Sequence, residues 1–458
     1  MLLSYWLAIV GEWRPAFVQS RLWRRAVAQA LGSLIAIGRR TVSRSIFALG
    51  HQQQDWSADY KLHARSKWEV DDLFDVVLNK ALPLCVDEFV AVAIDDTRLR
   101  KTGRHIRTAF FQRDPLSPKF RFNLMWGLRF LQVSLLVPLY RSQPASPRGL
   151  PLRFVECPAI KRPGRKAAAE QWNAYRQLCK TENLSRRAVA LLGNLRQAVD
   201  RTDAAAKKLL VVGDNSFCNR TVFGTLLDRT DLLVRARKDI RLCRQAPAGT
   251  ARFYATEKFT PEQVRLDDAV PWLTAEIFHG GQWRTVRYKQ LTAVYWQSGA
   301  RKRPLRLVVV APIPYYVPCR GRVHYHEAAY LLTTELTLAL SNLLQAYCDR
   351  WQIEVNHREE KDTLGVGQAQ VRARDSVCRQ PAFVVAAYSA LLLASLLAYG
   401  PGRGQTYEPL PRWRRRAPRP SCLDLLTVLR KQIADNPAML VPFGFHPDLK
   451  RLALTAAA

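Results

Sequence analysis

The alternation of apolar and polar positions divides the chain into a helical beginning and a longer region of strands and helices. Residues 1–88 repeat apolar side chains at the three- to four-residue spacing of amphipathic helices, as in RLWRRAVAQALGSLIAI. From residue 89 onward, runs rich in β-branched and aromatic residues alternate with helical segments. Strands that alternate with helices predict an α/β fold, in which helices flank a mixed sheet.

Two of the predicted strands end on aspartate. The apolar run FVAVAIDDT (89–97) closes on Asp95 and Asp96, and KKLLVVGDNSF (207–217) closes on Asp214. Chemistry in α/β sheets is placed at the C-terminal ends of strands, so we expect these aspartates at one edge of the sheet. Successive side chains of a strand point to opposite faces, so only one of Asp95 and Asp96 can face the same site as Asp214.

The remaining pattern completes the predicted organisation. Further predicted elements are, in chain order, one or two strands in 120–140, an irregular Pro/Gly-rich loop over 142–166, helices over 166–202, hairpin-forming strands over about 241–314 that turn at Gly280 and Gly281, and a strand over 329–335. We therefore predict a helical domain (1–88), an α/β domain (89–400) that carries the β-rich block as an inserted subdomain, and a Pro/Arg-rich linker with a helical tail (401–458).

One predicted helix raises the question of a membrane. Residues 382–399 carry no charge and are long enough to cross a bilayer. A helix that is apolar all round is also typical of the buried core helix of a large α/β domain, and we favour that interpretation. The nine scattered cysteines form no CxxC pair, and the N-terminus lacks the basic start of a signal peptide. We therefore predict a cytoplasmic protein with no membrane partner.

The charge of the chain indicates a polyanionic partner. Seventy Lys and Arg stand against 38 Asp and Glu, which gives a formal net charge of +32 and a pI near 10.3. Such a surplus is typical of proteins that bind nucleic-acid phosphates, and binding through phosphates weakens as salt rises. The basic segment RRTVSRSIFALG (39–50) follows a predicted helix and resembles the second helix of a helix-turn-helix pair. We expect Arg39, Arg40 and Arg44 to face DNA there, the alternative being two helices that only pack.

Four side chains share one face of a late predicted helix. Tyr347, Arg350, Glu354 and Lys361 lie at offsets 0, 3, 7 and 14, which places them within roughly 60° of one another on an α-helix. We expect this helix to end near Gly365, because glycine often follows the last helical residue. The face therefore combines a carboxylate with two phosphate-binding cations and an aromatic ring.

A site of three carboxylates follows from these patterns. Asp95 (with Asp96 as the alternative), Asp214 and Glu354, brought together at a sheet edge, have the hard oxygen ligands that suit two Mg²⁺ ions, or Mn²⁺ in their place. Two such ions, about 3.5–4 Å apart, support an in-line phosphoryl transfer. We expect the cations on the face of Glu354 to grip neighbouring phosphates, and Tyr347 to stack on a base or contact a phosphate.

The spacing of the four-residue face resembles the Y-R-E-K signature of bacterial insertion-sequence transposases of the DDE superfamily. IDDT (94–97) and VVGDNSF (211–217) are similar to the first and second aspartate motifs of that family, and the resemblance covers roughly residues 39–400. It implies an RNase H-like fold with a β insertion. The Asp-x-Thr pattern of the family favours Asp95 over Asp96 as the first carboxylate.

The resemblance also implies an activity and its partners. Members of this family are metal-dependent transposases that cut double-stranded DNA at the transposon ends and join the freed 3′-hydroxyls to target DNA, as a homodimer in a synaptic complex. In members with the β insertion a tryptophan receives a flipped base, and Trp283 or Trp296 is the candidate here. The implied location is the nucleoid. The alternative is a catalytically inactive DNA-binding protein derived from the same fold.

Overall fold

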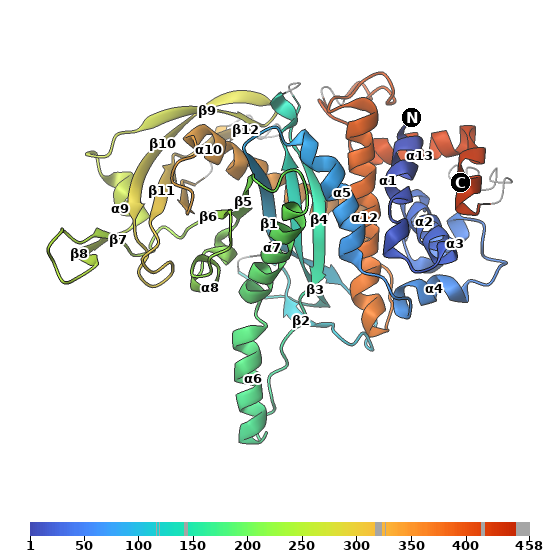
Figure 1. Cartoon of the computed structure of the whole chain (residues 1–458), viewed down its shortest axis with the longest axis horizontal. Coiled ribbons are helices and arrows are strands. Elements are labelled where there is room, and N and C mark those ends of the chain that lie inside the picture. Colours follow the sequence, from blue (N-terminus) through green and yellow to red (C-terminus); the bar gives the residue numbers. More distant parts are fainter. Residues whose placement is uncertain are drawn as a thin grey trace. The chain divides into compact units, whose positions relative to one another are not determined.

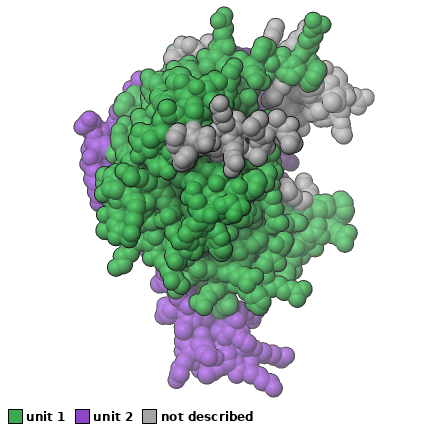
Figure 2. All heavy atoms as spheres, turned by 90° about the vertical axis from the view of Figure 1, so that its right-hand side faces the viewer, with its two compact units in different colours: residues 1–85, 96–161, 352–458 green, residues 86–95, 162–351 purple. Residues whose placement is uncertain are grey.

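The computed structural model describes residues 1–115, 117–118, 120–141, 145–316, 323–325, 327–413 and 417–445. The chain divides into two compact units, which Figure 2 distinguishes by colour. Unit 1 comprises residues 1–85, 96–161 and 352–458, and unit 2 comprises residues 86–95 and 162–351. The units cut across the ranges predicted from the sequence, so those ranges remain a prediction as domains. Arg414, Arg415 and Arg416 of the predicted linker, and the tail from residue 446, lie outside the described residues.

Unit 2 contains a mixed sheet in which three parallel strands are followed by antiparallel ones. In sheet order its strands are the first part of β1 (Phe89–Arg100), β5 (Lys208–Gly213), β6 (Thr230–Arg235), β14 (Ala329–Thr333), β11 (Leu305–Val310), β10 (Gln282–Val294) and β9 (Leu273–His279). The pairs β1–β5 and β5–β6 are parallel, and the pairs from β6–β14 onward are antiparallel (Figure 1). The predicted mixed sheet flanked by helices is therefore confirmed at the level of the α/β class.

The strands of the β-rich block continue the sheet of unit 2. The predicted turn is present, since Gly280 and Gly281 have φ values of +65° and +83° between β9 and β10. β9 and β10 join the sheet of unit 2 through β11, which pairs with β10 on one side and with β14 on the other. Two smaller two-stranded sheets lie beside them, β7 (Leu242–Gln245) with β8 (Tyr254–Phe259) and β12 (Pro314–Tyr316) with β13 (Val323–Tyr325).

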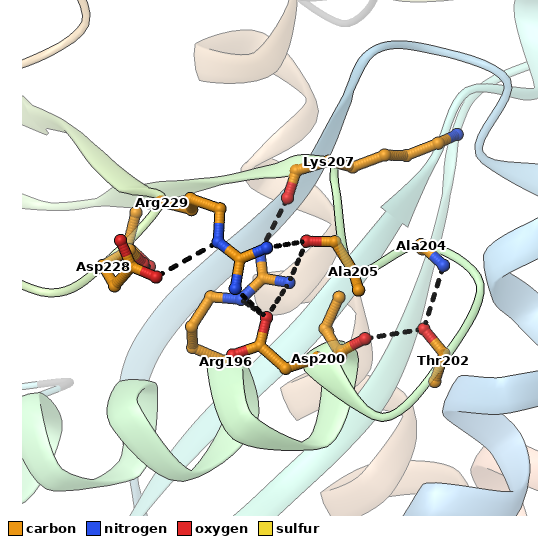
Figure 3. A network of polar contacts seen from close by, with 10 residues as sticks. Arg196, Asp200, Thr202, Ala204, Ala205, Lys207, Asp228 and Arg229 are labelled. Atoms are coloured by element: carbon orange, nitrogen blue, oxygen red, sulfur yellow. Dashed lines mark hydrogen bonds and ion pairs between the residues drawn. The ribbon is translucent and has the colours of Figure 1, made fainter.

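A buried arginine, Arg196, fixes the turn that precedes β5 in unit 2. Arg196 of α7 donates to the carboxylate of Asp200 at 3.0 Å and to the carbonyl of Lys207 at 2.7 Å (Figure 3). Arg229 donates to the same carboxylate oxygen at 2.9 Å and to the carbonyl of Ala205 at 2.6 Å. These bonds satisfy backbone carbonyls at the turn and fix the start of the strand that leads to Asp214. The helices of unit 2 are α6 (Ala169–Thr181), α7 (Leu184–Asp200), α8 (Arg220–Phe223), α9 (Pro261–Leu266) and α10 (Leu340–Asp349).

Unit 1 contains three strands besides the end of β1. β3 (Leu124–Val137) pairs antiparallel with β2 (Phe110–Arg113) and with β4 (Arg148–Glu156). The prediction of an irregular loop over 142–166 was therefore wrong for β4, because a proline was taken to exclude a strand. Pro151 lies opposite Ser134 where the register shifts, and a β-bulge is one of the places where a strand accepts proline.

Helix α12 (Arg374–Tyr399) forms the core of unit 1. It packs against β4 and against α1, α2, α4, α5 and α13 (Figure 1). Its apolar stretch is long enough to cross a membrane, yet 78% of that stretch is buried inside the protein. This burial confirms the interpretation as a core helix. The other helices of unit 1 are α1 (Leu2–Gly11), α2 (Ser20–Ile35), α3 (Val42–Ala48), α4 (Ser57–Ala64), α5 (Val70–Ala81) and α13 (Cys422–Asp435), while α11 (Trp351–Arg358) begins at the boundary between the units.

Candidate active site and nucleic-acid interface

Asp95 and Asp214 are placed side by side by the strand register. β1 and β5 run parallel, and their last paired residues are Ile94 and Gly213. The next residue on each strand is an aspartate. Because β5 ends at Gly213 while β1 continues to Arg100, the site lies at the end of the pairing rather than at the end of both strands. The register thus sets the backbones of Asp95 and Asp214 next to each other, and the meeting of their carboxylates stays a prediction.

The carboxylate of Asp214 is oriented by its own turn. Asp214 is the N-cap of a short 3₁₀ helix (Asn215–Phe217), and its Oδ1 accepts a hydrogen bond of 2.9 Å from the backbone N–H of Ser216. The hydroxyl of Ser216 donates to Oδ2 at 3.1 Å. The side chain is half-buried, so it keeps contact with solvent. Each carboxylate oxygen can accept more than one hydrogen bond, so both oxygens retain lone pairs that can bind a cation.

Asp96 is engaged elsewhere, within unit 1. Arg129 of β3 donates to both of its carboxylate oxygens, from Nε at 2.8 Å and from Nη2 at 2.9 Å. Arg98 lies 3.9 Å from the same group, whose side chain is only 9% exposed. A carboxylate held in a two-pronged ion pair is a poor ligand for a metal ion, because the arginine already neutralises it. Asp95 therefore stays the candidate. The partner Arg129 was missed in the sequence, where its position in an apolar strand carried no sign of its role.

The predicted single helix from Tyr347 to Gly365 is interrupted. Tyr347 lies in α10, Glu354 lies in α11, and Arg350 between them keeps helical backbone angles. Lys361 lies in a π-helical segment (Glu359–Thr363), where the N–H of Leu364 bonds to the carbonyl of Glu359 at 2.9 Å.

The wider π turn changes the rotation per residue. Lys361 therefore leaves the regular spacing, and its predicted place on the face of Glu354 is corrected. Tyr347, Arg350 and Glu354 are half-buried, and Glu354 belongs to unit 1.

The two glutamates of the π segment are core residues. Burial raises the pKa of Glu360 to about 8, so the group stays protonated at neutral pH. Glu359 accepts hydrogen bonds from the hydroxyl of Tyr388 and, at 3.4 Å, from the backbone N–H of Cys422. Both carboxyl groups therefore serve the interior of unit 1.

The two candidate tryptophans of unit 2 differ in exposure. Trp283 of β10 is 57% exposed and lies edge-on to Phe278, with ring centroids 5.6 Å apart. Trp296 is half-buried, packs edge-on to Phe223 and lies so close to Gly299 that a Cβ at that glycine would meet its ring. An aromatic ring must present its face to stack on a base, so Trp283 is the better placed of the two.

The basic segment after α2 has two kinds of arginine. The guanidinium of Arg40 donates to the carbonyls of Ser33 and Leu34 at 2.6 and 2.9 Å, and burial lowers its pKa to about 10. It closes the C-terminus of α2, which corrects its predicted contact with DNA. Arg39 and Arg44 are exposed.

A groove of 560 Å³ lies beside this segment in unit 1. Its lining includes Arg39, Thr41 and Ser43 at the start of α3, Tyr60 of α4, and Arg372. Hydroxyl and guanidinium donors around an open groove suit a phosphate backbone. The arrangement keeps Arg39 and the α3 start as candidates for a DNA interface.

Among the described residues, no group of three or more His, Cys, Asp or Glu side chains is close enough to hold one ion. The register places Asp95 and Asp214 at neighbouring positions of unit 2, whereas Glu354 belongs to unit 1. Two neighbouring carboxylates fit a divalent cation with hard oxygen preferences, which takes its other ligands from water or a phosphate.

Comparison with models of known protein families gives no match, and a search of curated proteins gives none either.

Proposed function

We propose that the chain is a DNA transposase of RNase H-like fold, which cuts the ends of a transposon and joins them to target DNA with the help of divalent metal ions. The observation that carries the proposal is the register of β1 and β5, which sets Asp95 beside Asp214 at one sheet edge. Acidic side chains at the ends of neighbouring parallel strands are expected where an α/β sheet performs phosphoryl transfer. The charge of +32 supports a DNA substrate.

Each proposed site residue has a role that its chemistry allows. Asp95 and Asp214 hold the metal ions, Mg²⁺ or Mn²⁺, and Glu354 completes the set as the resemblance implies. When bound, the ions supply charge stabilisation to the reacting phosphate. Arg350 orients a neighbouring phosphate, and Tyr347 contacts the backbone or a base. Ser216 keeps the Asp214 carboxylate in one orientation, so that less conformational freedom is lost when a ligand binds.

The DNA partner is bound through surfaces outside the carboxylates. Arg39 and Arg44 contact phosphates at the start of α3, and Trp283 accepts a flipped base if the second strand is cut through a hairpin. Transposon ends must be held together before they are joined, so the working form is a homodimer in a synaptic complex. Its place in the cell is the nucleoid.

The test is cleavage of labelled DNA that carries the inverted repeats flanking the coding region. Wild-type protein with Mg²⁺ should cut at the repeat ends, and cutting should be abolished in Asp95→Asn, Asp214→Asn and Glu354→Gln. Asp228→Asn is the matched control, because its side chain is 79% exposed on the surface of unit 2. Asp96→Asn should retain cutting, since that carboxylate is bound to Arg129. Cleavage that survives in both Asp95→Asn and Asp214→Asn refutes the proposal.

A second candidate is a DNA-binding protein without catalysis. It is supported by the net charge of +32, which favours DNA binding whether or not the DNA is cut. Wild-type protein that binds the repeats tightly and leaves them uncut in Mg²⁺ and in Mn²⁺ would establish this second function.

A further inference from the structure

The β2–β3 hairpin of unit 1 exposes aromatic rings to an unusual degree. Phe120 is 92% exposed, Phe111 68%, Phe122 65% and Leu124 58%. Large apolar side chains gathered on a surface cost free energy in water and mark a site where something docks. We define these four residues together with Arg113 and Arg121 as the hairpin face.

The face is a consequence of strand alternation. β2 pairs with β3 so that Phe111 lies opposite Trp126 and Arg113 opposite Leu124. Between them Gln112 points inward, where its amide donates to the carbonyl of Leu128. The inward positions thus belong to the core of unit 1, whereas the outward positions are apolar or basic on both strands. A strand that only covered a core would place polar residues on its outer face.

Hydrogen bonds join described residues on both sides of the hairpin tip. The N–H of Asp114 donates to the carbonyl of Asn123 at 2.9 Å, and the N–H of Asn123 donates to the hydroxyl of Ser117 at 3.2 Å. The guanidinium of Arg113 lies over the ring of Phe122, 5.6 Å from its centroid. The ring of Phe122 is therefore held against Arg113, which reduces the order that must be gained on binding.

The charge around the face selects its partner. Residues 98–124 contain eight Lys or Arg and a single acidic residue, Asp114, which is paired with Arg100 at 2.9 Å. Arg104, Arg107, Arg113 and Arg121 are all exposed. A second copy of this chain would bring the same positive charges against them, and like charges across an interface are unfavourable. A polyanion that contains stacked rings matches both parts of the face. Its negative charges can bind the arginines, and its rings can stack on the phenylalanines.

We propose that the hairpin face is a DNA-docking wedge, in which Phe120 and Phe122 stack against bases at an opened step while Arg113 and Arg121 bind the flanking phosphates. Apolar side chains that unstack a step, held in place by arginines on the backbone, are a known way of bending or opening a duplex. The wedge rests on the proposed function only for the choice of DNA as substrate. It adds a contact to the carboxylate site and to the segment around α3, neither of which includes these residues.

The experiment measures binding and base unstacking together. A duplex carrying 2-aminopurine is titrated with the full chain, and fluorescence anisotropy gives affinity while 2-aminopurine intensity reports unstacking. We expect Phe120→Ser/Phe122→Ser to lower affinity about tenfold and to remove the rise in intensity, with an unchanged salt slope. Arg113→Gln/Arg121→Gln should instead reduce the salt slope by about two. Leu226→Ser, at a side chain 76% exposed in unit 2, is the control for removing surface apolar area.

The outcomes separate this proposal from the proposed function. Suppose that the wild type unstacks the probe without cutting DNA, and that Phe120→Ser/Phe122→Ser loses both affinity and the 2-aminopurine signal. The wedge is then supported, while the transposase proposal fails. The wedge is overturned if Phe120→Ser/Phe122→Ser and the wild type show equal affinity and equal 2-aminopurine signals, even if both proteins cut DNA. The wedge is also overturned if sedimentation without DNA shows a dimer that Phe120→Ser/Phe122→Ser dissociates, since a second copy then covers the face.

Discussion

Replacing Glu360 by glutamine should stabilise the protein, and the gain should grow with pH. Glu360 is buried in the π segment beside Gln132 of β3, and burial raises its pKa from 4.5 to about 8. Its Oε1 and the Oε1 of Gln132 are both buried acceptors that receive no hydrogen bond. A carboxyl that keeps its proton can donate as well as accept, and a glutamine side chain of the same shape can do the same without holding a proton.

The magnitude follows from the two pKa values. In the unfolded chain Glu360 loses its proton above its ordinary pKa of 4.5, whereas the folded protein keeps the proton up to about pH 8. The folded state therefore binds more protons between these values, so stability falls as pH rises from 4.5 and levels off above 8. At pH 7, about 2.5 pH units above the ordinary value, the loss is about 3 kcal/mol. Glu360→Gln removes this loss, because an amide does not titrate.

The assay is urea unfolding followed by tryptophan fluorescence at pH 5 and pH 8. Glu360→Gln should exceed the wild type by roughly 1 kcal/mol or less at pH 5 and by several kcal/mol at pH 8. Glu257→Gln, at an exposed position of β8, is the control and should change stability by no more than about 0.5 kcal/mol at either pH. A variant whose advantage over the wild type is the same at both pH values, or one that is less stable at pH 8, refutes the reasoning.

Three further predictions test other parts of the structure. Arg196→Met should destabilise unit 2 by roughly 1–3 kcal/mol in thermal unfolding, because the carbonyl of Lys207 loses this buried donor while Asp200 and Ala205 keep Arg229; the exposed Arg201→Met should have little effect. Burial lowers the pKa of His63 to about 3, so stability should fall by roughly 2 kcal/mol between pH 7 and pH 5 as the unfolded chain takes up the proton, and urea titrations of His63→Gln should lack this dependence. The affinity for duplex DNA should fall linearly on a log–log plot against salt, and anisotropy titrations of Arg39→Gln should give a slope smaller by about one, whereas an unchanged slope would remove Arg39 from the interface.

Apolar runs predicted most of the strands and helices, because burial decides them locally. The strand that leads to Asp214 and the core helix α12 both follow uninterrupted apolar stretches, and both are found where they were predicted. β4 was not predicted, because Pro151 and the neighbouring glycine suggested a loop. Only the register shift of β3 around Ser134 makes room for that proline, and a register shift depends on the partner strand.

The displaced Lys361 has a similar explanation. A four-residue face was predicted on the assumption of 100° per residue, which holds only for an unbroken α-helix. The π segment widens the turn so that Glu359 and Glu360 reach the interior, and Tyr388 donates to the first of them. The partner of Glu359, Tyr388, lies far along the chain, so local spacing carries no sign of this contact.

The choice between Asp95 and Asp96 shows how one strand can serve two purposes. Alternation along β1 sends the two carboxylates to opposite faces, and the pairing of β1 with β5 ends at the residue before Asp95. On the other face, Arg129 of β3 neutralises Asp96, so that a nearly buried carboxylate is stable there. If Asp96 were the metal ligand and Asp95 the partner of an arginine, Arg129 would lose its partner and the carboxylate beside Asp214 would be a neutralised one. The ion pair with the arginine on the neighbouring strand is therefore a physical reason to propose Asp95, and not the adjacent aspartate, as the metal ligand.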